Sequence, residues 1–176
     1  DGGAKVIILQ KTPTVLTTST AVSGGLFAAA GTRAQKEKGI KDSAELFYQD
    51  YVKNGGYMNI PELAKLLTFN SVKVFEWLVD NGLPSFHFEP YPGHSVLRGH
   101  RSDKNSGREL TETILAQVKK RKIPIMFETT VTRLYAGPKG RVAGVEASGK
   151  GKRMNIRARR AVIMAAGGFV RDAKTF

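Results

Sequence analysis

The chain has 176 residues, of which 41% are hydrophobic and 24% charged, a composition typical of a globular domain with its own core. It contains no cysteine, which excludes disulfides, thiolate metal sites and cysteine nucleophiles. No apolar run approaches the roughly 20 residues of a membrane span. Because the sequence starts with Asp1 and not with methionine, it gives no information on targeting or compartment.

The charge is strongly basic, with 28 lysine and arginine residues against 15 acidic ones and a net charge of +13. Basic clusters lie at 119–122 and 150–160. Such a balance favours contact with polyanions, but no basic-aromatic interleaving or known nucleic-acid module is present. Contact with nucleic acid or an anionic surface through these clusters is therefore a weaker, third hypothesis beside the two given at the end of this section. The second cluster alternates with other residues, which indicates a solvated sheet face.

The first half of the chain predicts one strand and then helices. A strand is expected over 5–10, with an apolar body typical of a buried strand. Small residues over 24–30 favour a short helix. A helical block is expected over 43–82, because Ser43 is a good N-cap. Within the block we expect a break near Asn70.

The second half predicts a long loop and a sheet. Prolines and aromatics indicate an irregular loop over 83–106, and a loop of that length is often functional. An amphipathic helix follows at 107–120, and then a strand at 123–127. Turn residues divide 130–158 into a three-stranded antiparallel meander. A final buried strand is expected over 160–166.

The final strand ends in small residues, namely Ala165, Ala166, Gly167 and Gly168. Small residues allow another backbone or a flat ligand to come close. In open α/β sheets, ligands lie just beyond the carboxyl ends of the strands. An ordinary glycine turn after a strand would give the same pattern.

This order of elements resembles the FAD-binding domain of the fumarate reductase and succinate dehydrogenase flavoprotein family, above all flavocytochrome c-type fumarate reductases and 3-ketosteroid dehydrogenases. The resemblance covers almost the whole chain and is carried by the stretches Gly3 to Lys11, Ser23 to Ala30, 43 to 82, His100 to Leu110, Glu128 to Leu134 and Ala161 to Phe169. It implies an α/β fold over 1–176: a Rossmann-like FAD-binding domain with a partly parallel sheet, a helical block and a three-stranded antiparallel meander, incomplete at both ends.

The resemblance also implies an adenosine end of the FAD site. Family members carry Glu after the strand that corresponds to 5–10, and its carboxylate accepts hydrogen bonds from the ribose. Here Gln10, followed by Lys11, takes that place, which loses a charge-assisted bond but keeps one amide acceptor. Thr130 and Val131 match the position whose backbone amide and carbonyl read the adenine edge. A plain strand position is the alternative for Val131.

Three further segments match cofactor-contacting turns of the family. Ser23, Gly24 and Gly25 match the small-residue turn beside the flavin, and Ala165, Ala166 and Gly167 match the turn against the dinucleotide. Thr18 lies where the family has Gly-Gly-Asn-Ser or Thr. Two glycines are replaced there by Leu16 and Thr17, so we expect these two residues to be strained or to obstruct FAD.

The resemblance assigns no catalytic residue to this chain, because the substrate-binding and proton-donating residues of the family lie in later segments. The three histidines, His87, His94 and His100, do not have metal-ligand spacing, and no metal site is predicted. We expect His100 to lie in the long loop as a surface or loop-stabilising residue.

Two hypotheses follow. In the first, the chain is part of an FAD-dependent oxidoreductase that moves a hydride between flavin and a C–C bond of a dicarboxylate or ketone substrate, and is inactive alone. In the second, it is a flavin-free binding or interaction module that keeps the fold. On either hypothesis, missing N-terminal and C-terminal segments or another chain would complete the sheet.

Overall fold

The computed structural model describes residues 3–168, and the chain divides into two compact units. One unit combines Asp1–Ser19 with Lys122–Phe176, and the other is Thr20–Arg121. The single domain predicted over 1–176 is thus built as two units, each of which is described by itself below. The ends of that prediction, 1–2 and 169–176, lie outside the described residues.

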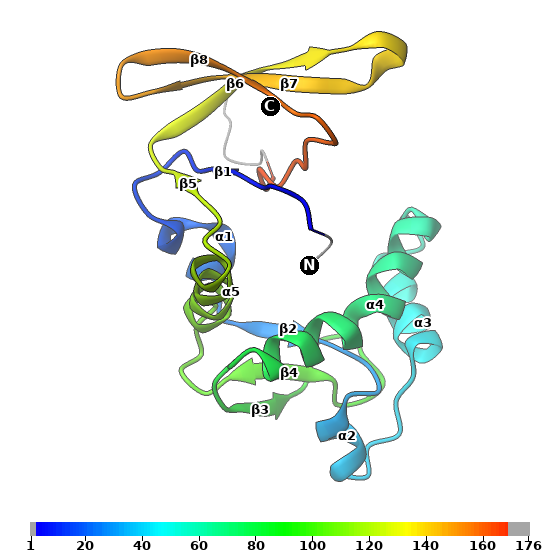
Figure 1. The fold of residues 1–176 in the computed structure, drawn as a ribbon. Helices are drawn as coiled ribbons and strands as arrows, with labels where there is room; N and C mark the ends of the chain where they lie inside the picture. The colour runs from blue at the N-terminus through cyan, green and yellow to red at the C-terminus, as the bar shows by residue number, and fades with distance from the viewer. Residues whose placement is uncertain (1–2, 169–176) are drawn as a thin grey trace. The chain divides into compact units, whose positions relative to one another are not determined.

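The first unit contains a short parallel pair of strands. β1 (Ile8–Leu9) pairs with β5 (Ile125–Met126), and the pairing is parallel (Figure 1). The partly parallel sheet is therefore confirmed, but the strand expected over 5–10 is only two residues long. Val6 and Ile7 precede it and are 48% and 42% exposed. They lie outside the ladder because β5 offers only two residues to pair with.

The meander expected over 130–158 is found in the same unit. β6 (Thr129–Ala136), β7 (Val142–Gly149) and β8 (Lys152–Arg157) form an antiparallel sheet in that order. A short 3-10 turn, η2 (Pro138–Gly140), joins the first two strands. The second connection is Lys150-Gly151, in which both residues have positive φ, as a two-residue hairpin requires.

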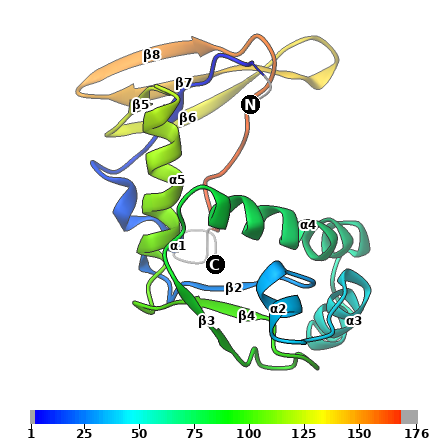
Figure 2. The same cartoon turned by 60° about the horizontal axis from the view of Figure 1, so that its bottom comes forward.

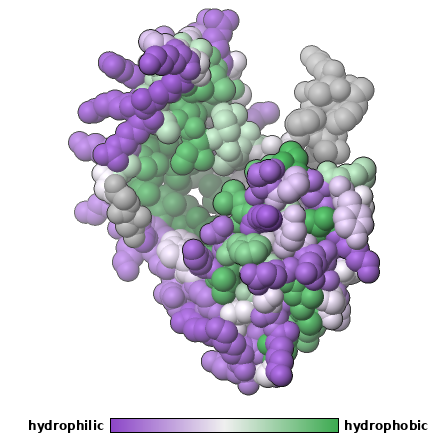
Figure 3. All heavy atoms as spheres, turned by 90° about the vertical axis from the view of Figure 1, so that its right-hand side faces the viewer, coloured by the Kyte–Doolittle hydropathy of each residue, from purple (hydrophilic) through white to green (hydrophobic). Residues whose placement is uncertain are grey.

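One face of this sheet is hydrophilic. In the upper part of Figure 3, long hydrophilic side chains project on one side of the β6–β7–β8 sheet, and hydrophobic residues lie on the other. Exposed apolar residues of the unit include Val131 and Leu134 on β6. The separation agrees with the solvated basic face that the sequence indicates.

The final strand expected over 160–166 is not found, and that prediction is wrong. Residues 158–168 form no regular element, and Ile163 and Met164 are 88% and 62% exposed. A parallel strand is stabilised by ladder hydrogen bonds and by layers on both faces. Among the described residues no strand pairs with this segment, so its apolar pattern has no ladder to join.

The second unit is an antiparallel sheet covered by helices. β4 (Gly99–Ser102) lies between β2 (Leu26–Ala28) and β3 (Phe86–Glu89) (Figure 2). The helices of this unit are α1 (Ser19–Val22), which begins at the unit boundary, α2 (Arg33–Glu37), α3 (Ala44–Asn54), α4 (Pro61–Asp80) and α5 (Arg108–Lys120). The 3-10 turn η1 (Val15–Thr17) belongs to the first unit.

Three predictions for this unit need correction. The helix expected over 24–30 is the strand β2, and the irregular loop expected over 83–106 contains β3 and β4. Each strand is only three or four residues long, and β2 pairs with β4 across a large sequence separation, so local patterns do not reveal this sheet. The helical block 43–82 is confirmed as α3 and α4, with Ser43 as N-cap of α3. No break occurs at Asn70, because α4 is continuous.

An aromatic cluster forms the core of this unit. Phe75 on α4 is 1% exposed and lies 5.6 Å from Phe27 on β2 and 4.9 Å from Phe86 on β3, measured between ring centroids. The His100 ring lies 4.1 Å from the Phe75 ring. These contacts hold α4 along one face of the sheet, and α3 packs against α4.

Candidate functional site

Gln10 lies at the carboxyl end of β1, beside the start of β6. Its backbone N–H donates to Met126 O at 2.9 Å, and its carbonyl accepts from Thr129 N at 2.9 Å. The side-chain Nε2 donates to Thr12 Oγ1 at 2.6 Å and to Thr14 O at 3.2 Å. These bonds orient the amide and use its donor, and among the described residues no hydrogen bond reaches Oε1. The next residue, Lys11, is exposed.

The backbone of Val131 points away from β7. Thr129 donates its backbone N–H to Gln10, so the backbone N–H and C=O of Thr129 face β1. Those of Thr130 face β7. Because backbone polar groups alternate along a strand, the N–H and C=O of Val131 face the same side as those of Thr129. The structure thus brings Gln10 and the Val131 backbone edge to one side of β6.

The segment that replaces the family glycines is relaxed. Leu16 and Thr17 form the 3-10 turn η1, and neither has positive φ. Thr14 caps the turn by accepting from Leu16 N at 3.2 Å, and Thr18 closes it with its N–H and its hydroxyl on Val15 O. The expectation of backbone strain is therefore wrong. That Leu16 and Thr17 obstruct FAD stays a prediction.

The turn Ser23-Gly24-Gly25 belongs to the second unit and is packed by that unit's own backbone. Gly25 has φ +70°, and a Cβ added to it would lie 2.6 Å from the carbonyl carbon of Ser106. Gly107 N donates to Ser23 O at 2.8 Å. Arg101 donates to Gly24 O at 2.8 Å. Close approach of the 106–107 backbone is thus a sufficient reason for glycine at position 25, while Ser23 and Gly24 stay exposed.

The remaining predicted segment, Ala165-Ala166-Gly167, lies in the irregular 158–168 stretch and is exposed. Gly167 has φ +75°, and a Cβ added there would meet no atom within 4 Å. Nothing among the described residues packs on this turn, so the structure leaves it accessible but does not join it to the Gln10 region.

A buried ion cluster, made of Asp42, Asp50 and Arg98, was not anticipated from the sequence. The Arg98 side chain is fully buried, with Nη2 2.8 Å from Asp42 Oδ1 and Nη1 2.8 Å from Asp50 Oδ2. The guanidinium also lies 4.9 Å from the Phe47 ring centroid. Burial alone would raise the pKa of Asp50, but hydrogen bonds from the Ser95 N–H and hydroxyl, together with Arg98, lower it below its usual range.

His100 is also buried, at 1% exposure, and lies in β4 rather than in a loop. Its Nδ1 lies 2.9 Å from Arg98 O, which can only accept, so Nδ1 carries the hydrogen. Nε2 then accepts from the Thr32 hydroxyl at 3.0 Å. Burial lowers the pKa of His100, and the expectation of a surface or loop-stabilising role is wrong.

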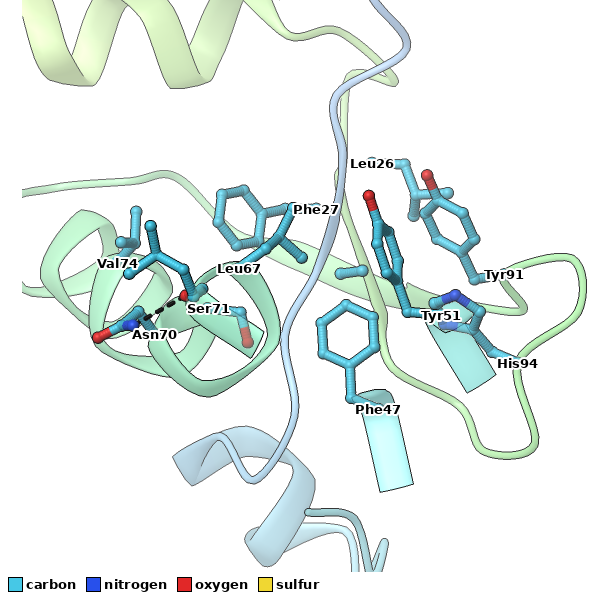
Figure 4. A pocket seen from close by; sticks show the side chains of 12 residues that line it. Leu26, Phe27, Phe47, Tyr51, Leu67, Asn70, Ser71, Val74, Tyr91 and His94 are labelled. Atoms are coloured by element: carbon cyan, nitrogen blue, oxygen red, sulfur yellow. Dashed lines mark hydrogen bonds between the residues drawn. The ribbon is translucent and has the colours of Figure 1, made fainter. Parts of the chain in front are cut away.

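An apolar cavity of about 520 Å³ opens in the second unit between α3, α4, β2 and the 91–94 segment (Figure 4). Phe27, Leu67 and Val74 lie toward one end, and Tyr51, Tyr91 and His94 gather at the other. The cavity is lined by Leu26, Phe27, Ala28, Phe47, Tyr51, Leu66, Leu67, Asn70, Ser71, Val74, Tyr91 and His94.

Within residues 3–168, no group of three or more His, Asp or Glu side chains is placed to hold a metal ion. In the same residues, no helix has both the length and the apolar character that a membrane crossing needs.

Comparison with known proteins gives one family. The model of the FAD binding domain matches residues 1–175. The chain is 34% identical to the NADH:fumarate oxidoreductase of Klebsiella pneumoniae and 32% identical to the fumarate reductase (cytochrome) of Shewanella frigidimarina, over 96% and 98% of its length. It spans 18% and 30% of the length of these two relatives.

Solved structures agree with this result. The open conformation of a flavocytochrome c3 fumarate reductase matches 91% of the chain with a TM-score of 0.85 and 29% identity, over 29% of that protein. A 3-ketosteroid-delta4-(5alpha)-dehydrogenase from Rhodococcus jostii matches 93% of the chain with a TM-score of 0.79 and 25% identity, over 41% of that protein. The chain therefore belongs to the FAD-binding domain family, among the flavoproteins of the fumarate reductase type, whose cofactor is FAD.

Proposed function

We propose that this chain supplies the FAD-binding part of an oxidoreductase that moves a hydride between flavin and a C–C bond next to a carboxylate or ketone. The family match over 1–175 carries the proposal. The two curated relatives named above are fumarate-reducing enzymes by name, and one of the similar structures is a ketosteroid dehydrogenase. These names set the substrate classes that we propose.

The adenosine end of the cofactor is assigned to the Gln10 region. The Gln10 Nε2 is already used by Thr12 and Thr14, so the Oε1 atom is the part of the amide that remains to accept a ribose hydroxyl. The Val131 N–H and C=O, which face away from β7, form a donor and acceptor pair of the kind that an adenine edge needs. The chemistry of these groups fits the cofactor.

The flavin end is assigned to Ser23, Gly24 and Gly25. Ser23 and Gly24 are exposed and lack bulk, and the 106–107 backbone and Arg101 hold the turn in place. Lys11, Thr18 and the Ala165-Ala166-Gly167 turn are also assigned to contacts with the cofactor. Those assignments rest on their register in the family alone.

When bound, FAD supplies the hydride chemistry, and the chain supplies binding and orientation. Because the chain is expected to be inactive alone, the test uses the parent protein that contains it: the bound flavin is reduced without oxygen, fumarate or an unsaturated ketone is added, and the flavin absorbance is followed. We expect reoxidation by one of these acceptors and none by succinate, which has no double bond to reduce. A reduced flavin that oxygen reoxidises but neither acceptor does would contradict the proposed reaction.

A further inference from the structure

We propose that one face of the β6–β7–β8 sheet is a docking surface for an acidic protein. This surface, which we call the arginine face, consists of Arg133, Tyr135, Glu146, Arg153, Asn155 and Arg157. It lies within the first unit, and its charged residues are not among those assigned to FAD. The inference therefore goes beyond the proposed hydride transfer and does not depend on it.

The strand register brings the three arginines together. Arg133 on β6 lies opposite Glu146 on β7, which lies opposite Asn155 on β8, and directly opposed residues share a face of a sheet. Arg153 and Arg157 are two residues on either side of Asn155, so they lie on the same face. With strands about 4.8 Å apart and alternate residues about 6.7 Å apart, the three arginine Cα atoms form a triangle with sides of about 12–13 Å around Glu146.

The charge of this sheet is almost entirely positive. Residues 129–160 include nine lysines and arginines and a single acidic residue, Glu146. Arg133 and Arg157 are exposed, and among the described residues neither forms a hydrogen bond or an ion pair. The Arg153 side chain is 77% exposed, with Nε 3.9 Å from Glu146 Oε1. Because a guanidinium binds a carboxylate through two parallel hydrogen bonds, the face offers three positions for carboxylates of a partner.

Glu146 adds a requirement at the centre of the triangle. Its carboxylate accepts a hydrogen bond from the Thr132 hydroxyl at 2.8 Å and lies 3.1 Å from the Tyr135 hydroxyl. These hydrogen bonds, with the charges of Arg153 and Arg133, lower the pKa of Glu146, so it stays ionised. A matching partner places acceptors over the arginines and an N–H donor over Glu146. A protein surface carries both kinds of group, whereas a phosphate backbone carries acceptors only.

Two other classes of anionic partner fit the face less well. Single-stranded nucleic acids stack their bases on exposed aromatic rings, but Tyr135, the single aromatic residue of 129–160, is half-buried and hydrogen-bonded to Glu146 and Asn155. Membrane surfaces hold basic segments most firmly where apolar side chains insert beside them. In this sheet Val145 and Ala147 are buried and alternate with the residues of the arginine face, so they lie on the opposite side.

The test measures binding of three anionic probes to the 176-residue chain at about 50 mM salt, where charges are weakly screened. The probes are a fluorescent peptide of alternating glutamate and glutamine, a thymidine oligonucleotide of equal charge, and vesicles that contain phosphatidylserine. We expect saturable binding of one peptide per chain, tighter than that of the oligonucleotide or the vesicles. Binding should weaken as salt is added, because the contacts are exposed.

Two triple variants of equal net charge locate the site. Arg133→Gln, Arg153→Gln and Arg157→Gln together should weaken peptide binding at least about tenfold, or about 1.4 kcal/mol. Lys119→Gln, Lys120→Gln and Lys122→Gln remove the same charge from the other exposed basic cluster, and should weaken it less than about threefold, through net charge alone.

Absence of saturable peptide binding, or equal losses in the two triple variants, would overturn the proposal. Tighter binding of the oligonucleotide or the vesicles through the same three arginines would also overturn it, because the partner would then be a nucleic acid or a membrane. FAD binding is measured in the same samples, so a failure of the cofactor assignment is scored separately.

Discussion

Replacing Arg98 by methionine should strongly destabilise the Thr20–Arg121 unit. At 2.8 Å and an effective dielectric constant of about 20, each Arg98–aspartate pair has a Coulomb energy of roughly 6 kcal/mol, most of which offsets the cost of burying the charges. The variant loses the attraction but keeps two carboxylates, and the Asp42 side chain is fully buried. Breaking a buried pair in this way costs about 3–5 kcal/mol.

The assay is urea unfolding followed by fluorescence of Trp77, the single tryptophan of the chain, which lies on α4 of this unit. Arg33→Met is the matched control. Arg33 also pairs with two carboxylates, those of Glu76 and Asp80, but its side chain is 56% exposed, so its loss should cost less than about 1 kcal/mol. Equal free-energy losses in the two variants would refute the argument that burial makes the Arg98 cluster important.

Three further predictions follow from individual contacts. Gly25→Ala should lower the urea midpoint clearly more than Gly39→Ala: both glycines have positive φ, but only at Gly25 would the added Cβ meet backbone atoms. Burial lowers the pKa of His100, so below about pH 6.5 the unfolded chain binds a proton that the folded chain does not. The melting temperature should therefore fall from pH 7 to pH 5, and it should fall less in the His100→Gln variant. Gln10→Ala should weaken FAD binding about two- to tenfold in a titration, while the exposed Gln49→Ala on α3 should not; equal affinities would exclude Gln10 from the site.

Local sequence signals predicted local structure well. Ser43 marks the start of α3, and the turn residues at 137–140 and 148–151 divide the meander, because capping and positive-φ turns depend on a few neighbouring residues. The strands β2, β3 and β4 were missed for the opposite reason. Their stability comes from pairing across the sequence, such as Phe27 with His100, and not from any local pattern.

The segment 160–166 shows the opposite error, a strand that is predicted from the sequence but does not form. Its pattern of apolar and small residues is typical of a buried strand, yet Ile163 and Met164 are exposed because no described strand pairs with them. An apolar sequence pattern shows which environment would stabilise a segment. A strand also needs a neighbouring strand with which its backbone can form hydrogen bonds, and the pattern does not show whether one is present.

Some residues of the candidate sites could likewise be predicted from the sequence, and others could not. Gln10 and Val131 were found through the register of the family, and the structure places both on one side of β6. The Arg98 cluster and the apolar cavity had no signal in the sequence. Asp42 and Arg98 are 56 positions apart in the sequence, and their charges meet only in the folded unit.

The most direct test of the account is the visible absorption spectrum of the purified protein, followed by titration with FAD. The account predicts flavin bands near about 370 and 450 nm, which the isoalloxazine ring brings with it, or saturable binding of added FAD. A colourless protein that shows no saturable binding of FAD would contradict the assignment of Gln10, Val131 and the Ser23–Gly25 turn to a cofactor site, and would favour a flavin-free module with the same fold.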